Sequence, residues 1–165
     1  METSDGFTLI ETILYIALFA IVIGGGMVAS YQIIQATDAN YNHIIVQEEA
    51  NFLFRKIDWA LTGATSICSA SGSNLAVTKI SPTSCSTAAN VLVFDLSGSD
   101  IRITRGVATP VILNSSSISV SNLLFVKTLG LNGRPDSVAI SFTLTTTQSG
   151  RPASQSFSMT RYLRK

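Results

Sequence analysis

The chain of 165 residues has few of the side chains on which catalytic and metal sites are usually built. It contains one histidine, His43, and two cysteines. A Ser-His-Asp triad would have to use His43, which falls in a polar stretch with helical periodicity, where we expect it to be solvated. The two cysteines are also too far apart for the CxxC spacing that marks a zinc site. The sequence therefore predicts no enzyme, no metal site and no cofactor.

Charge is scarce as well. Charged residues make up 13% of the chain, against about 25% in soluble domains. A net charge of +1 gives no strong attraction to nucleic acid, so a nucleic-acid partner is not indicated. All four prolines lie beyond residue 81, so the first part of the chain has no helix breaker of that kind. This composition is typical of a membrane-anchored chain rather than of a soluble enzyme.

Charged residues are missing altogether from residues 12–37, and most of this run is Ile, Leu, Val, Ala, Gly and aromatic. About twenty helical residues cross the hydrocarbon core of a bilayer, so the run is long enough to span a membrane. Glu11 stands at its start, where an ionised carboxylate is costly and usually marks a function. Gly24, Gly25 and Gly26 lie inside the run. They either divide it into two helices, since three glycines cost about 3 kcal/mol relative to alanine, or let a neighbouring helix approach closely.

The hexapeptide GFTLIE at residues 6–11, followed directly by the apolar run, resembles the processing and methylation motif of type IV prepilins and pseudopilins. The resemblance implies that a prepilin peptidase removes residues 1–6 by cutting after Gly6 and then methylates the new N-terminus, Phe7. The family's acidic residue falls on Glu11. The leader has no Lys or Arg, unlike most leaders of this family. Either the positive-inside rule gives no orientation here, or the natural start lies upstream.

Two local interpretations compete with this resemblance. Thr8 and Glu11 have the spacing of a capping box, which satisfies free backbone N–H groups where a helix begins. This role is compatible with the prepilin role. A secretory signal peptide is the other alternative, but its apolar region is about 7–15 residues long and follows basic residues. Neither property fits the first 37 residues of this chain.

Helical periodicity continues beyond the apolar run. Apolar residues recur at spacings of three and four from Tyr41 to Ala64, with charged residues between them. Gly63 is a candidate helix end, although the pattern continues weakly to Ile67. We therefore predict one long helix, with a transmembrane half at residues 7–35 and an amphipathic half at residues 36–67.

Residues 68–165 are predicted to form an antiparallel β-rich domain. Val138, Ile140, Phe142 and Leu144 alternate with small or polar residues, which is typical of a half-buried strand. The predicted fold class is α+β, with a sheet resting on the amphipathic half of the helix, as in type IV pilins. The order of the strand patterns is also similar to that of larger minor pilins and minor pseudopilins. Strands are predicted at residues 75–80, 91–96, 101–105, 111–113, 118–127, 137–146 and 154–163.

Cys68 and Cys85 flank a stretch rich in Ser, Thr, Gly and Asn. In an exported domain such a pair favours a disulfide, worth roughly 3 kcal/mol in the chain-entropy model. The alternative is two unpaired buried thiols.

The resemblance implies a structural subunit, a minor pilin or pseudopilin, of a type IV pilus, competence or type II secretion filament. Its expected partners are other pilin or pseudopilin subunits, a prepilin peptidase, the inner-membrane assembly platform and, before assembly, the lipid bilayer. The expected location is the cytoplasmic (inner) membrane, in a single pass with an exported C-terminal domain. After assembly, it is a filament in the periplasm or at the cell surface. A membrane-tethered surface binding or adhesion module that never assembles is the alternative function.

Overall fold

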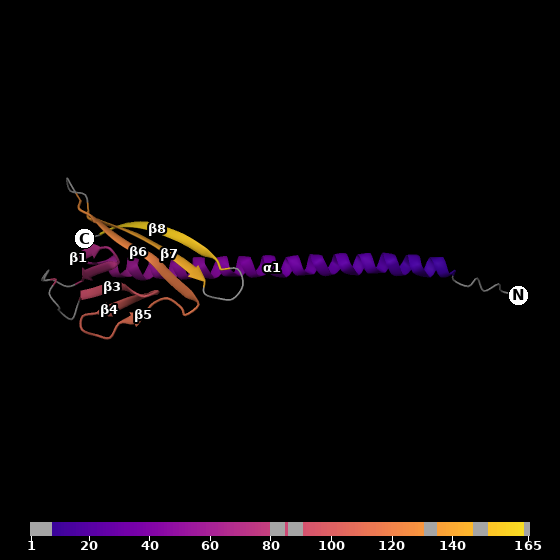
Figure 1. The fold of residues 1–165 in the computed structure, drawn as a ribbon. Helices are drawn as coiled ribbons and strands as arrows, with labels where there is room; N and C mark the ends of the chain where they lie inside the picture. The colour runs from indigo at the N-terminus through magenta and orange to yellow at the C-terminus, as the bar shows by residue number, and fades with distance from the viewer. Residues whose placement is uncertain (1–7, 80–84, 86–90, 131–134, 147–151, 164–165) are drawn as a thin grey trace. The chain divides into compact units, whose positions relative to one another are not determined.

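The computed structural model describes residues 8–79, 85, 91–130, 135–146 and 152–163 (Figure 1). The chain divides into two compact units, Met1–Asn40 and Tyr41–Lys165. One helix, α1 (Leu9–Leu61), supplies the secondary structure described in the first unit and begins the second. The eight strands of the described residues all belong to the second unit. The predicted α+β layout is thus confirmed, with a long apolar N-terminal helix followed by antiparallel sheets.

α1 continues through Gly24, Gly25 and Gly26 without a break, so these glycines do not divide it into two helices. A glycine lowers helix propensity but keeps its backbone N–H, and the 53 residues of α1 include no proline. The predicted C-terminal limit of the helix, residue 67, is wrong. α1 ends at Leu61, and Gly63 adopts a left-handed conformation (φ 72°) that stops the helix. Two residues later, the Thr65 N–H bonds to the Thr78 carbonyl at 2.8 Å.

The strands form two antiparallel sheets (Figure 1), whereas a single sheet was expected. The seven predicted strands correspond to β2 through β8, and β1 was missed by the prediction. The five-stranded sheet contains, in spatial order, β1 (Ser66–Ser71), β2 (Asn74–Thr78), β3 (Val91–Ser97), β4 (Asp100–Arg105) and β5 (Val111–Ile112). The three-stranded sheet contains β6 (Ile118–Thr128), β7 (Ser137–Thr146) and β8 (Ser154–Tyr162).

β6 connects the two sheets. Its Phe125 N–H bonds to the Gly72 carbonyl in the β1–β2 turn at 2.7 Å, and its Val120 N–H bonds to the Ser99 carbonyl in the β3–β4 turn at 2.9 Å. Between these contacts the register of β6 shifts at a bulge, where Asn122 has φ 53°. Asparagine is among the residues that tolerate this left-handed conformation. The tips of two hairpins therefore satisfy backbone donors of β6 that no strand pairs.

The core of the second unit lies between residues 41–61 of α1 and both sheets. Buried apolar residues of α1 recur at spacings of three and four, whereas those of β7 alternate. The Phe54 ring lies 4.9 Å from the Phe142 ring and 6.4 Å from the Phe157 ring, measured between centroids. The fully buried side chains include Val46, Leu53, Ile57, Leu75, Phe94, Ile101, Ile118, Phe125, Ile140, Phe142 and Leu144.

Two polar networks fix the connections between strands. In the first, buried Asn114 accepts a hydrogen bond from Ile101 N–H at 2.8 Å and donates to the carbonyl of Ile118 at 2.8 Å. Its amide also donates to Asp100 Oδ1 at 3.2 Å. This one side chain therefore ties the segment after β5 to β4 and to the start of β6.

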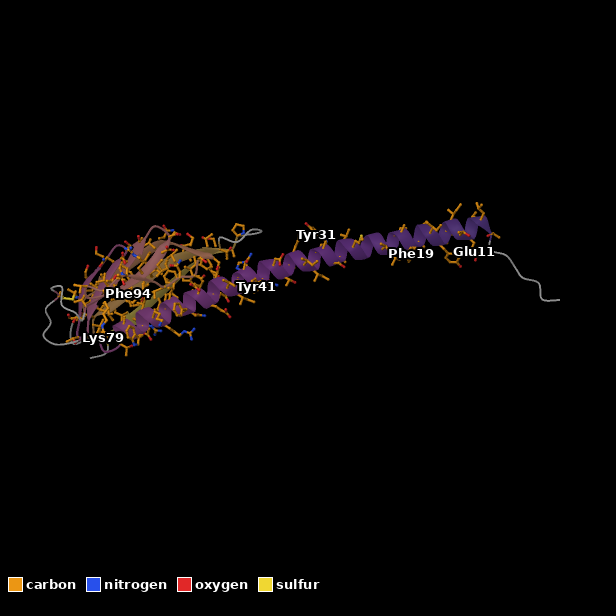
Figure 2. All side chains as sticks on the ribbon, turned by 90° about the horizontal axis from the view of Figure 1, so that it is seen from below. Glu11, Phe19, Tyr31, Tyr41, Lys79 and Phe94 are labelled. Atoms are coloured by element: carbon orange, nitrogen blue, oxygen red, sulfur yellow. A yellow bond between two sulfur atoms is a disulfide. The ribbon has the colours of Figure 1, made fainter. Side chains whose placement is uncertain are left out.

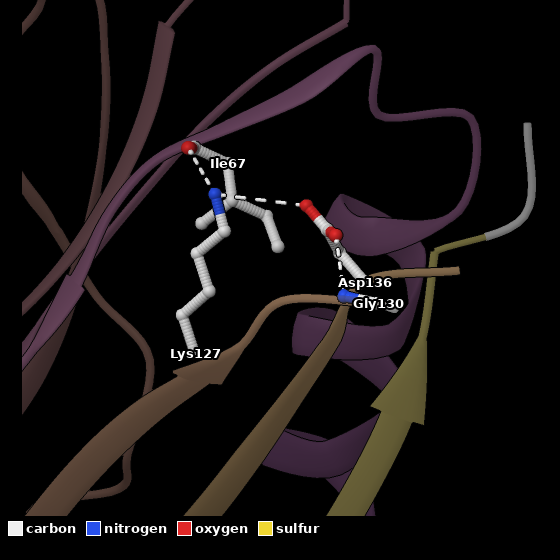
Figure 3. A network of polar contacts seen from close by, with 4 residues as sticks. All are labelled: Ile67, Lys127, Gly130 and Asp136. Carbon is white, nitrogen blue, oxygen red and sulfur yellow. Dashed lines mark hydrogen bonds and ion pairs between the residues drawn. The ribbon is translucent and has the colours of Figure 1, made fainter. Parts of the chain in front are cut away.

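The second network joins β1, β6 and the residues before β7 (Figure 3). Lys127 Nζ lies 3.4 Å from the Ile67 carbonyl and 3.7 Å from Asp136 Oδ2. The other carboxylate oxygen of Asp136 accepts the Gly130 N–H at 2.9 Å. Because it bonds both the β6 lysine and Gly130, Asp136 fixes the chain at each end of the β6–β7 connection.

Candidate functional site

The first turn of α1 places an acidic side chain where helix geometry favours it. Thr8 directly precedes the helix, and its Oγ1 accepts a long hydrogen bond of 3.4 Å from the Glu11 N–H. Thr8 is therefore the N-cap residue, and its bond to Glu11 is one half of the capping box. Glu11 also lies near the positive end of the helix dipole. Gly6 and Phe7, the predicted processing residues, lie outside the described part of the chain.

The Glu11 carboxylate has a polar neighbour but no countercharge among the described residues. Its Oε1 accepts the Tyr15 hydroxyl at 3.4 Å, one turn further along α1. The ion pairs of the described residues involve Asp58, Asp95 and Asp136, and none involves Glu11. This carboxylate, at the edge of a long apolar segment, is thus available to pair with a cation that does not belong to the described residues.

The surface of α1 beyond Glu11 is apolar and exposed. α1 is long and apolar enough to cross a membrane, and no part of its most apolar stretch is buried. Figure 2 shows Phe19 and Tyr31 projecting from this part of the helix. The exposed large apolar side chains here are Leu9, Ile10, Ile13, Leu14, Tyr15, Ile16, Leu18, Phe19, Ile21, Val22, Ile23, Met27, Val28, Tyr31, Ile33 and Ile34. Such a surface requires lipid or another apolar partner.

Gly24, Gly25 and Gly26 leave a stretch of this surface without side chains. A Cβ atom added at any of the three would meet nothing within 4 Å. The described fold therefore gives no steric reason for glycine at these positions. A second helix that packs closely against the backbone would give one.

The structure joins Cys68 and Cys85 in a disulfide, with their Cα atoms 5.5 Å apart. Cys68 lies at the bulge of β1, between Ile67 and Ser69, where the register with β2 shifts. The bond therefore anchors an exposed residue of the β2–β3 connection to the edge of the five-stranded sheet. Disulfides of this kind persist in oxidising compartments.

One surface feature was not anticipated from the sequence. Trp59, the chain's one tryptophan, is 55% exposed on α1. The ammonium of Lys79, the residue directly after β2, lies 4.1 Å from the centroid of the Trp59 ring and 2.6 Å from the Trp59 carbonyl. One turn earlier, Lys56 Nζ lies 5.3 Å from the Phe52 ring centroid. The recurrence of Phe52 and Trp59 was visible in the sequence, but the position of Lys79, twenty residues further on, depends on the fold.

The remaining candidate, His43, lies exposed on α1. Within the described residues, no group of three or more His, Cys, Asp or Glu side chains could hold a metal ion. Three structural features therefore have clear chemical consequences. They are Glu11, which has no ion-pair partner among the described residues, the apolar surface that follows it, and the second unit with its internal disulfide.

Comparison with known proteins adds no assignment, because no family model, curated protein or solved structure gives a significant match to this chain.

Proposed function

We propose that the chain is a structural subunit of a type IV pilin-like filament, a minor pilin or pseudopilin, that assembles through its N-terminal helix. The observation that carries the proposal is Glu11, a carboxylate at the start of an exposed apolar helix with no countercharge among the described residues. The GFTLIE motif around it supports cleavage after Gly6 and methylation of the freed Phe7 amine.

The chemistry of assembly follows from the cost of isolated charge in an apolar medium. An unpaired carboxylate or ammonium in such a medium costs several kcal/mol, and much of this cost is recovered when the two are paired. The Phe7 amine of one processed subunit and Glu11 of its neighbour form such a pair. Pairing would fix the register between two helices and favour transfer of a subunit from the bilayer to the filament.

The second unit fits an exported position. The Cys68–Cys85 disulfide supports an oxidising compartment. α1 would hold the chain in the inner membrane in a single pass before assembly, as a substrate of the prepilin peptidase and the assembly platform. In the filament, the apolar parts of the helices would contact one another.

Processing is tested by co-expression with a prepilin peptidase and intact-mass measurement. We expect loss of residues 1–6 and gain of one methyl group, whereas Gly6→Ala should stay full length. A mature chain that retains its leader in the native host would refute the proposal.

Substitution of Glu11 separates assembly from simple anchoring. Glu11→Gln and Glu11→Val both leave the Thr8 side chain free to cap the Glu11 N–H, since that bond uses only the backbone of Glu11. Both should remain in the membrane but lose at least tenfold in filament incorporation, the equivalent of about 1.4 kcal/mol. Asp38→Asn, an exposed acid on the same helix, is the matched control.

If both Glu11 variants assemble normally while Thr8→Val does not, helix capping rather than charge pairing is the role of the motif. If the processed wild-type chain stays in the membrane as a monomer even with an assembly machinery, it is a tethered binding module.

A further inference from the structure

β8 forms one edge of the three-stranded sheet, since it pairs with β7 on one side and with no described strand on the other (Figure 1). At one end of this pair, the Thr146 N–H bonds to the Ala153 carbonyl at 3.0 Å. At the other end, the Leu163 N–H bonds to the Asp136 carbonyl at 2.8 Å. Such positions recur at every second residue of an antiparallel pair, so the odd-numbered residues of β8 bond to β7. The even-numbered residues therefore point their N–H and C=O groups away from β7.

These outward backbone groups form a row, which we call the β8 edge. Among the described residues, no backbone hydrogen bond is made to them. A row of unpaired N–H and C=O groups is a template on which another strand can pair. All the residues that form the β8 edge are exposed, and they are Ser154, Ser156, Ser158, Thr160 and Tyr162.

β8 has few of the features by which proteins protect an exposed edge. Protected edge strands are usually short, or they carry lysine, proline or a bulge. β8 is 9 residues long, has no proline, and keeps an unbroken register with β7. Its one charged residue is Arg161. By contrast, β6 at the opposite edge of the same sheet has a bulge and is contacted by two hairpin turns. Within the described chain, nothing therefore obstructs the addition of a strand beside β8.

A groove between α1 and β8 would receive one face of such an added strand. Phe54 and Met159 are partly buried against the core and give the groove an apolar floor. Successive side chains of a strand point to opposite faces, so every second side chain of the added strand would face this groove. Apolar side chains suit its floor. The groove is lined by Asn51, Phe54, Arg55 and Asp58 of α1 and by Met159 and Arg161 of β8.

The charges of the groove indicate an acidic partner. Arg161 Nε lies 3.1 Å from Asp58 Oδ1, so these two side chains form an ion pair. Arg55 is exposed, and it takes part in none of the ion pairs between described residues. Its Nε donates to the Asn51 carbonyl, a neutral group, at 3.3 Å. The groove therefore has an excess of positive charge, which a carboxylate on the added strand would balance.

A second copy of this chain has no free strand that supplies this carboxylate. The described strands that contain an acid are β3, through Asp95, and β4, through Asp100. Both already pair with a strand on each side. A second β8 has no acid and would bring another arginine. Antiparallel pairing of two β8 edges would also turn the two copies of α1 in opposite directions, which does not suit chains anchored through α1 in one membrane.

We propose that the β8 edge binds an extended segment of a different protein, which adds as a strand beside β8. Its apolar side chains would contact Phe54 and Met159, and its carboxylate would pair with Arg55. Main-chain hydrogen bonds would supply the affinity of this contact, and the groove would supply its specificity. The site belongs to the second unit, so binding does not depend on the charge pair of Glu11 or on filament assembly.

A proline substitution in the full-length chain, held in detergent, tests the β8 edge. The probe is the peptide TVTVTETVT, blocked at both ends, whose valines and glutamate share one face when it is extended. Ser158→Pro removes an outward N–H that β7 does not use, so β8 should keep its pairing while peptide binding weakens at least about tenfold. Ser158→Ala keeps this N–H and, as the matched control, should bind like wild type. In the wild-type complex, hydrogen exchange should slow at the amides of Ser156, Ser158 and Thr160.

A charge swap tests the chemistry of the partner and does not require the proline variant to fold. Arg55→Glu should weaken binding of this peptide by about threefold to fivefold, since exposed charge pairs have effects of this size. The same variant should prefer the peptide TVTVTRTVT, in which arginine replaces the glutamate. Arg105→Glu, an exposed charge on β4, is the control and should leave both affinities unchanged. Retention of the Cys68–Cys85 disulfide verifies folding.

Equal peptide binding by folded Ser158→Pro and wild type would overturn strand addition at the β8 edge. An unchanged preference between the two peptides in Arg55→Glu would overturn the acidic partner. If the wild-type chain binds neither peptide but forms dimers that Ser158→Pro abolishes, the occupant is a second copy and the proposal is wrong. All these measurements use unassembled protein, so their failure would leave the filament function standing.

Discussion

Loss of the Asn114 side chain should destabilise the second unit, because three strand segments depend on it. Asn114→Ala removes the acceptor for Ile101 N–H and the donor for the Ile118 carbonyl, and both residues are buried. Each buried group left without a partner costs about 1–3 kcal/mol. Since water can enter part of the space, we expect a loss of about 2–4 kcal/mol in the free energy of unfolding, out of a total of about 5–15 kcal/mol.

The assay is thermal unfolding of the full-length chain in detergent, followed by circular dichroism and by fluorescence of the single tryptophan, Trp59. For a unit the size of Tyr41–Lys165, 1 kcal/mol corresponds to about 4 °C, so Tm should fall by about 8–16 °C. Ser121→Ala, on the exposed part of β6, is the control and should change stability by less than about 0.5 kcal/mol. An equally small change in Asn114→Ala would refute this account of the network.

Asn114→Asp sharpens the test. A carboxylate keeps an acceptor for Ile101 N–H but cannot donate to the Ile118 carbonyl, and it would lie beside the Asp100 carboxylate. Protonation removes the repulsion and restores a donor. The loss in the free energy of unfolding, measured relative to wild type at the same pH, should therefore be smaller at about pH 4 than at about pH 7. A deficit that does not depend on pH would contradict the assigned contacts.

Two further predictions concern the disulfide and the glycines. Reduction of Cys68–Cys85 should lower the Tm of the second unit by about 10 °C, because closing a loop of this length is worth roughly 3 kcal/mol. An unchanged Tm after complete reduction, verified by thiol capping, would show that packing holds this connection. Gly25→Ala should raise the intrinsic stability of α1 by about 1 kcal/mol while reducing filament incorporation, since its added methyl meets nothing in the described chain and would clash only with a partner. Incorporation equal to wild type would remove the glycines from the assembly surface.

The long helix and β2 through β8 could be predicted because their signals are local. Alternation in β7 and the apolar run of α1 are each visible within a window of about ten to twenty residues. β1 was missed because its sequence, SICSAS, has few of the residues typical of strands. It becomes a strand through pairing with β2 across the turn at Gly72, where φ is 58°.

The division into two sheets could not be predicted, because it depends on contacts between distant residues. The contacts of Phe125 with Gly72 and of Val120 with Ser99 place β6 against hairpin turns instead of another strand of the first sheet. The same reason applies to the candidate sites. Glu11 and Gly24–Gly26 could be read from local sequence, whereas the contact of Lys79 with the Trp59 ring depends on the fold.

The attachment of β6 to two hairpin tips has a practical consequence for engineering. Surface turns are usually where epitope tags and labelling loops are inserted, because they tolerate added length. The turns at Gly72 and Ser99 are different, since their carbonyls accept hydrogen bonds from β6. Extra residues there would separate the two sheets. In the turn after β4, Val107 is exposed, and the backbone N–H groups of Gly106 and Ala108 bond to carbonyls of Val91 and Arg105 in the same sheet rather than to β6. This turn is therefore the better place for a tag.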